Sequence, residues 1–121
     1  MPPPISFNRF HVYTLRQPLS PTSAIQFALV VTNDKFSNRR EIPVVSVLFL
    51  HPTARGFESS LRVKIQCRNT GGTARLPYDH FVVMDQLTPI PPRLLMETSG
   101  TEISEVEKRE VTAKLRDWLD L

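Results

Sequence analysis

Two short apolar runs in this chain each end in polar side chains that could take part in catalysis. Residues 81–84 read Phe-Val-Val-Met, and Asp85 and Gln86 follow directly. Residues 27–31 form a similar run, followed by Asn33 and Asp34. Small β domains often place their chemistry where strands open into polar loops, and a carboxylate there can accept a proton. An Asp at a strand exit also commonly caps a loop, so both roles stay open for Asp85, while Gln86 is expected to be a structural hydrogen-bond partner.

Three histidines are further candidates for proton transfer, because imidazole titrates near neutral pH. His51 follows the most hydrophobic stretch of the chain and precedes a proline loop, whereas His11 and His80 lie on or beside predicted strands. A solvated loop histidine without a role is the plainer interpretation of His51. The three histidines lack the spacing of metal ligands, and Cys67 is the only cysteine. The sequence therefore predicts no metal site and no cofactor.

A basic strand face is predicted between residues 61 and 68. Apolar residues alternate there with Arg62, Lys64 and Arg68, which indicates a half-buried strand with one cationic face. Phe57 and Tyr78 could stack on unpaired bases, although packing at the core rim is the plainer role. The candidate phosphate contacts are Arg55, Arg62, Lys64, Arg68 and Arg75.

The bulk properties indicate one folded domain with a basic body. The chain has 121 residues, 40% of them hydrophobic, and a net charge of +3. Eleven Lys and Arg against six Asp and Glu fall in residues 1–100, so a polyanionic partner is one interpretation and a solvated surface the other. No membrane-length apolar run or signal peptide is visible, and a cytoplasmic protein without a membrane partner is expected.

The patterning predicts a mostly β domain with one long helix. Residues 1–9 are expected to form a flexible arm and residues 10–121 a single domain. Asn33 or Asp34 could cap a helical turn reaching residue 40, residues 93–96 could form another turn, and Pro89, Pro91 and Pro92 are expected to block any regular element. The fold predicted is a small curved antiparallel sheet, or a partly open SH3-like barrel, with a C-terminal helix packed on it. The predicted strands are 10–15, 26–32, 42–50, 61–68 and 81–84.

A C-terminal helix is predicted from Ser104 onward. Ser104 and Glu107 match a capping box, in which each side chain binds the other residue's backbone N–H. Trp118 is expected to be a core or dimer contact. The apolar stripe expected to pack on the sheet is Ile103, Val106, Val111, Leu115, Trp118 and Leu119.

The order of these motifs resembles the MazF/PemK/Kid family of toxin endoribonucleases. The similar segments are the strand 26–36 with its Asn-Asp end, the strand 44–50, the Asp85-Gln86 pair and the closing helix over 100–121. The resemblance implies a CcdB/MazF-like fold, a homodimer and an antitoxin protein as partner. It also implies cleavage of single-stranded RNA, as an mRNA interferase, without a metal.

Some family positions hold different residues here. A family Arg falls on Gln26, a Thr on Phe49, and a second Arg on Val83. The resemblance therefore places catalytic roles at Asp85 and Gln26, while His51 could supply proton transfer and Arg16 or Arg55 a cation. The alternative is a toxin-fold protein that binds RNA, DNA or a protein such as gyrase without cleaving. A toxin remnant, or a subunit whose site is completed by a partner, is the third interpretation.

Overall fold

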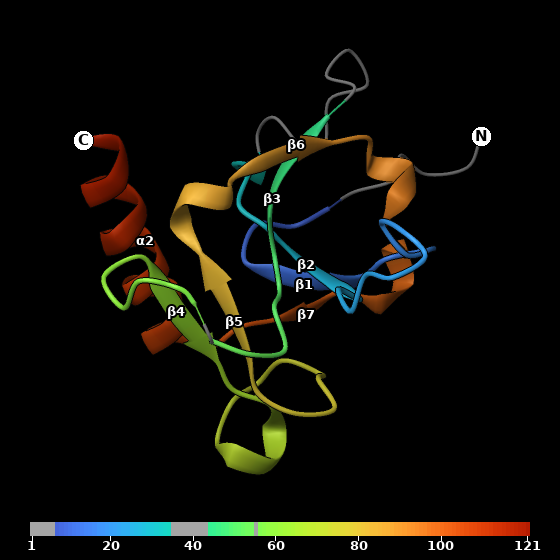
Figure 1. Ribbon diagram of the computed structural model, residues 1–121, viewed down its shortest axis with the longest axis horizontal. Helices are drawn as coiled ribbons and strands as arrows, with labels where there is room; N and C mark the ends of the chain where they lie inside the picture. Colours follow the sequence, from blue (N-terminus) through green and yellow to red (C-terminus); the bar gives the residue numbers. More distant parts are fainter. Residues whose placement is uncertain (1–6, 35–43, 55) are drawn as a thin grey trace.

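Five strands form one antiparallel sheet in the computed structural model, which describes residues 7–34, 44–54 and 56–121. They are β1 (His11–Thr14), β2 (Phe27–Val30), β3 (Val45–Phe49), β6 (Thr88–Ile90) and β7 (Thr101–Glu102). Their spatial order is β6-β3-β2-β1-β7, so the sheet is open and β6 and β7 are its edges (Figure 1). β4 (Arg62–Ile65) and β5 (His80–Val83) form a separate antiparallel pair, and α2 (Glu105–Leu119) ends the fold.

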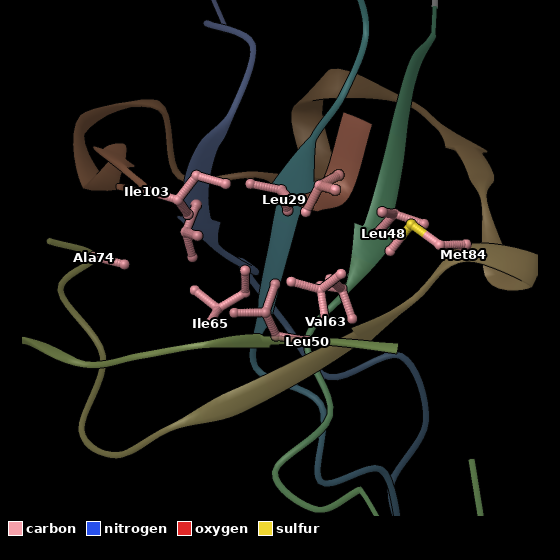
Figure 2. Close-up of a cluster of buried hydrophobic side chains, with 11 residues drawn as sticks. Leu29, Leu48, Leu50, Val63, Ile65, Ala74, Met84 and Ile103 are labelled. Atoms are coloured by element: carbon pink, nitrogen blue, oxygen red, sulfur yellow. The ribbon is translucent and has the colours of Figure 1, made fainter. Parts of the chain in front are cut away.

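One face of the sheet packs against the β4–β5 pair and α2. Leu29 and Leu48 project from adjacent central strands toward Val63 and Met84 on the opposite side (Figure 2). Burial of these aliphatic side chains is the main stabilising contribution to this half of the domain. The buried members of this cluster are Val12, Leu29, Leu48, Leu50, Val63, Ile65, Ala74, Val82, Met84, Ile103 and Val111.

The other face of the same sheet is also buried. Tyr13 and Val30 alternate along their strands with the residues of the first cluster and point the opposite way. This explains why residues 27–31 are continuously apolar. A strand that is buried on both faces has no solvent-exposed face, so polar residues do not alternate with the apolar ones. The second cluster contains Phe7, Tyr13, Leu15, Ala28, Val30, Val45, Val47, Ile90 and Leu95.

The predicted fold class is confirmed, because the described residues form a mostly antiparallel, open β structure with one C-terminal helix. The predicted strands all appear, with ends shifted by one to three residues where the structure describes them. The capping box at the start of α2 is also present. The Ser104 hydroxyl accepts the Glu107 N–H at 3.2 Å, and the Glu107 carboxylate accepts the Ser104 N–H at 3.0 Å.

The predicted apolar stripe of α2 is only partly correct. Ile103 and Val111 are buried, and Leu115 packs beside them. Val106 and Trp118, however, are 66% and 50% exposed, and Leu119 is exposed as well, so the expected core role of Trp118 is wrong. The reason is that the main contacts of α2 are with β4 and with the short 3-10 turn over Met84–Gln86, while its last turns stand away from the sheet (Figure 1).

The expectation that prolines prevent regular structure after residue 88 is wrong. Thr88–Ile90 forms edge strand β6, in which Pro89 lies opposite Ser46. The Ser46 N–H is donated to the Thr32 hydroxyl at 2.6 Å, and its carbonyl accepts the Val31 N–H at 3.0 Å. Both backbone groups of Ser46 therefore point toward β2, and the missing N–H of Pro89 removes no bond from the ladder.

Some predictions fall outside the described residues. These are most of the N-terminal arm, the helical turn up to residue 40, and the first residues of the 42–50 strand. Phe7 is described and buried, and its ring packs edge-on against Tyr13 at a centroid distance of 5.1 Å. None of the helices in the described segments has the length and apolar character needed to span a bilayer.

Candidate functional site

His51 and Gln86 form the best-defined polar pair at the strand exits. The His51 Nε2 atom lies 2.7 Å from the Gln86 Oε1 atom. An amide oxygen only accepts, so this contact requires the proton of a neutral His51 ring to be on Nε2. The Nδ1 atom is then left with a free lone pair, which is the atom that could accept a proton from a substrate.

The backbone of His51 is fixed by β5 rather than by its own sheet. Its N–H is donated to the Phe81 carbonyl at 2.7 Å, and its carbonyl accepts the Phe81 N–H at 2.8 Å. The chain therefore leaves β3 at His51 and pairs with the strand that leads to Gln86. This link joins the five-stranded sheet to the β4–β5 pair, and it brings residues 35 positions apart into contact.

An aromatic ring lies beside the histidine, and a cation binds the backbone of that aromatic residue. The Phe57 ring is 4.6 Å from the His51 ring, measured between centroids, at an interplanar angle of 55°. The Arg62 guanidinium donates to the Phe57 carbonyl at 2.9 Å, so one cation is attached to the same loop. Phe57 is half-buried, which matches packing at the rim. The combination of imidazole, aromatic ring and guanidinium is one that RNA-binding sites use.

Asp85 lies next to this pair in the chain. It is exposed, in the 3-10 turn directly after β5, and no other described residue hydrogen-bonds or ion-pairs with its carboxylate. Loop capping by Asp85, the alternative raised by the sequence, is therefore not seen among the described residues. The carboxylate is exposed, one residue before Gln86 in the chain, and is therefore available to a ligand.

Gln26 lies elsewhere, in an open concavity at the start of β2. Its carbonyl accepts the Leu15 N–H at 2.9 Å, which continues the β1–β2 pairing beyond both strands. Arg16 lines the same concavity, so the structure brings Gln26 together with one of the two cations considered for it. The other, Arg55, lies outside the described residues. The lining residues are Thr14, Leu15, Arg16, Gln17, Pro18, Ser23, Ile25 and Gln26.

The predicted basic face is divided in the structure. Arg62 and Lys64 lie on β4, and the Lys64 ammonium is 3.8 Å from the Asp79 carboxylate. Arg68 and Arg75 belong to the connection between β4 and β5, at the end of β5 opposite Gln86 (Figure 1). The Arg68 Nε donates to the Thr73 carbonyl at 3.2 Å. These cations do not form one cluster around His51.

Asp79 organises this connection, a role that the sequence analysis did not identify. Its Oδ1 atom accepts the Thr70 hydroxyl at 2.6 Å and the Cys67 N–H at 2.9 Å. The Thr70 hydroxyl, then the Cys67 N–H, hold the pKa of the Asp79 carboxyl below its ordinary value. Cys67 itself is buried, as its place on the apolar face predicted. Short-range capping contacts of this kind are typical of Asp in turns, which was the available signal.

His80 is buried in an aromatic stack. Its ring lies 4.7 Å from the Tyr78 ring at 13° and edge-on to Phe27 at 5.3 Å. Burial lowers the pKa of His80, and the Tyr78 carbonyl and Asp79 oppose this shift. The His80 Nδ1 atom lies 2.8 Å from the Tyr78 carbonyl, to which it donates. His80 therefore has a structural role. The Tyr78 ring is exposed, and one of its faces is covered by His80. Within the described residues, no group of three or more His, Cys, Asp or Glu side chains is placed to hold a metal ion.

Comparison with known proteins identifies the family. The PemK-like, MazF-like toxins of type II toxin–antitoxin systems match residues 8–119. The chain belongs to this toxin family. MazF (Form-I) from Deinococcus radiodurans has a similar structure, with a TM-score of 0.62 and 17% identity over 96% of this chain and 98% of that one. At this identity the structural likeness shows a shared fold, and a search of curated protein sequences gave no significant match.

The structure also shows the surroundings of the toxin-family positions that differ here. Phe49 is half-buried and packs against the second core cluster, and Val83 is 3% exposed. Neither can contribute a polar group to a ligand. Gln26 is exposed but uncharged. The polar candidates that remain for chemistry or binding in the described part of the chain are therefore His51, Asp85 and the concavity that Arg16 and Gln26 line.

Proposed function

We propose that this toxin-family protein is a metal-independent endoribonuclease that cleaves single-stranded RNA in the cytoplasm. It would act as a homodimer and be neutralised by an antitoxin protein. Membership of the toxin family supports the biological role. The observation that carries the chemistry is the His51–Gln86 pair, which fixes an imidazole at a strand exit with Nδ1 free to accept a proton.

The reaction needs a base for the ribose 2′-hydroxyl and stabilisation of the phosphorane. His51 Nδ1 accepts the 2′-hydroxyl proton, and the 2′-oxygen attacks the adjacent phosphorus. The bond from phosphorus to the 5′-oxygen breaks, and that oxygen takes a proton from solvent. The products are a 2′,3′-cyclic phosphate and a 5′-hydroxyl. Asp85, free of described partners and one residue from Gln86, is the second candidate for proton transfer or for orienting the base.

The second candidate function is binding without cleavage. Phe49 and Val83, at positions where the toxin family has polar groups, are packed into the protein, and this observation favours a fold retained for recognition of RNA, DNA or a protein. The exposed apolar side chains at the end of α2 offer a surface for such a protein contact. They are Trp118, Leu119 and Leu121.

One experiment separates these functions. A long unstructured RNA is incubated with purified protein in EDTA, beside the variants His51→Gln, Asp85→Ala and His11→Gln. His11 is the matched control, because it is also half-buried but bonds the Arg9 carbonyl away from Gln86. Cleavage by the wild type and His11→Gln, with a loss of about a hundredfold or more in His51→Gln, supports the proposal.

Intact RNA after incubation with folded wild-type protein would overturn the nuclease assignment. Salt-dependent retention of that RNA in a gel would then support a nucleic-acid binder. If His51→Gln still cleaves RNA and Asp85→Ala does not, the protein is a nuclease in which Asp85, rather than His51, transfers the proton.

A further inference from the structure

We propose that the outer face of the β4–β5 pair binds the RNA segment beside the cleaved bond, with Phe81 stacked on a base and Lys64 on a phosphate. This inference rests on the proposed function and assigns two binding residues to it. The outer face is the side turned away from the first core cluster, and it carries Arg62, Lys64 and Phe81. These residues alternate along their strands with buried ones such as Val63 and Val82.

Strand register brings His51, Phe81 and Lys64 into one row. Phe81 exchanges two backbone hydrogen bonds with His51, at 2.7 and 2.8 Å, and lies directly opposite Lys64 on its other side. Residues directly opposite in antiparallel strands project their side chains to the same face. Because the Phe81 N–H and carbonyl both point to His51, Phe81 and Lys64 form a non-hydrogen-bonded pair, in which side chains lie closer. The imidazole, the phenyl ring and the ammonium are therefore neighbours in that order.

Phe81 is an aromatic residue outside the core. Within the described chain it belongs to neither core cluster, nor to the half-buried side chains packed against them, and its own side chain is half-buried. Core packing therefore does not account for the ring. A phenyl ring on the surface of a sheet, beside a basic strand, is an arrangement with which RNA-binding sheets stack unpaired bases.

Lys64 carries a charge that the protein holds only loosely. Its side chain is 53% exposed, and its ammonium lies 3.8 Å from one oxygen of the Asp79 carboxylate. The other oxygen of Asp79 accepts the Thr70 hydroxyl at 2.6 Å and the Cys67 N–H at 2.9 Å, so Asp79 stays satisfied without Lys64. An exposed ion pair of this length contributes little to stability. A phosphate can therefore compete for the Lys64 ammonium.

The row begins at the proposed catalytic base. Neighbouring strands lie about 4.8 Å apart, so His51 and Lys64 are separated by about 10 Å across β5. This separation places Lys64 beside a phosphate further along the RNA rather than at the cleaved one. The border of the face is formed by Arg62 and Phe57, since the Arg62 guanidinium donates to the Phe57 carbonyl and the Phe57 ring contacts His51. The surface is thus continuous with the His51–Gln86 site.

Binding of a labelled 2′-O-methyl RNA oligonucleotide, which the proposed chemistry cannot cleave, tests this surface directly at several salt concentrations. Phe81→Leu and Lys64→Gln each remove one contact, whereas Phe81→Tyr and Lys64→Arg keep it. Arg75→Gln is the matched control, because it removes one charge from an exposed position in the connection between β4 and β5, outside the row. Thermal melting of each variant checks that it is folded.

The two removals are expected to differ in their salt dependence. Phe81→Leu should weaken binding about tenfold at every salt concentration, because it removes stacking and no charge. Lys64→Gln should weaken binding about fivefold and reduce the slope of log affinity against log salt concentration by about 0.7, the value for one phosphate contact to a single strand. Phe81→Tyr and Lys64→Arg should bind nearly as the wild type does. Arg75→Gln should lose less than about twofold, with an unchanged slope.

The outcomes separate this surface from the nuclease proposal. Losses in Phe81→Leu and Lys64→Gln no larger than in Arg75→Gln, or an unchanged slope in Lys64→Gln, would overturn the surface while leaving the nuclease proposal intact. Wild-type protein that binds RNA through these residues but does not cleave RNA would support the surface and overturn the nuclease. A folded wild type that neither binds nor cleaves RNA would overturn both.

Discussion

The carboxylate of Glu107 on α2 accepts the backbone N–H of Gln66, at the exit of β4, at a distance of 2.7 Å. Two helical turns later, the Lys114 ammonium donates to the Arg62 carbonyl at 2.7 Å and to the Ser59 carbonyl at 3.1 Å. These backbone groups point away from β5 and would otherwise form an open sheet edge. Side chains of α2 therefore replace a missing strand, which protects β4 from pairing with another chain.

Replacing Glu107 with Gln should destabilise the fold. Glu107 is buried and its two oxygens accept N–H groups from Ser104 and Gln66, whereas a Gln side chain offers one oxygen and turns an NH₂ group toward the other donor. The expected loss is about 1–3 kcal/mol in the free energy of unfolding, measured by urea denaturation. Glu110→Gln is the control, because among the described residues that exposed side chain makes only a 3.6 Å ion pair with Lys114. It should cost less than about 0.5 kcal/mol, and equal losses would contradict this account.

The parts of the fold that were predictable depend on local patterns. Ser104 and Glu107 are three residues apart, so their capping box is readable from the sequence, and the continuous apolar run at 27–31 correctly indicates a strand buried on both faces. The role of Trp118 was not predictable in this way. Its helical spacing matches the buried Val111, but exposure depends on how far α2 extends beyond β4, which no local pattern records.

In the candidate site, too, the features set by local sequence were predictable and the contacts between distant residues were not. Asp85 and Gln86 were identifiable as polar residues at a strand end. The contact of Gln86 with His51 joins residues 35 positions apart, and it depends on His51 leaving β3 to pair with Phe81. The proximity of Arg16 to Gln26 likewise depends on the β1–β2 register. Side-chain types alone do not encode these distances, because strand register is set by packing of the whole sheet.

The edge position of Pro89 leads to a prediction about two neighbouring residues. Both backbone groups of Ser46 point to β2, so Pro89→Ala should change the free energy of unfolding by less than about 1 kcal/mol. Hydrogen-bonded and non-hydrogen-bonded pairs alternate along an antiparallel ladder. The next pair after Ser46 and Pro89, formed by Val47 and Thr88, is therefore a hydrogen-bonded pair. Thr88→Pro should therefore cost about 1–3 kcal/mol, because it leaves a strand acceptor unsatisfied. Urea denaturation of both variants measures the difference, and a larger loss in Pro89→Ala would show that the register is assigned wrongly.

Gln86 is expected to act on cleavage through His51 as a positioning residue. Gln86→Leu removes the acceptor that fixes the His51 ring, and should lower kcat about tenfold while leaving KM for RNA nearly unchanged. Gln86→Glu keeps an acceptor oxygen at that position and should retain much more of the activity. Steady-state kinetics on a fluorogenic RNA distinguish the two. A rise in KM without a change in kcat would instead indicate that Gln86 contacts the substrate.

The buried His80 should make folding stability sensitive to mild acid. Burial holds the pKa of His80 below its ordinary value of 6.5, so the folded protein disfavours its protonation. The unfolded chain takes up this proton as the pH falls through 6.5, while the folded chain does not until the pH reaches the lowered value. Stability contributed by the neutral ring is thus fully present above pH 6.5 and declines below it. Asp79, whose pKa is lowered from 3.8, affects stability only in a more acidic range.

His80→Phe is the variant that tests this dependence. It preserves an aromatic ring against Tyr78 and Phe27 but has no titratable group. The midpoint of urea denaturation is expected to fall between pH 7 and pH 5 in the wild type and to change much less over that range in His80→Phe. His11→Gln is the control, since it removes a half-buried histidine outside this stack and should keep the wild-type slope. A slope that persists in His80→Phe would assign the acid sensitivity to a different group.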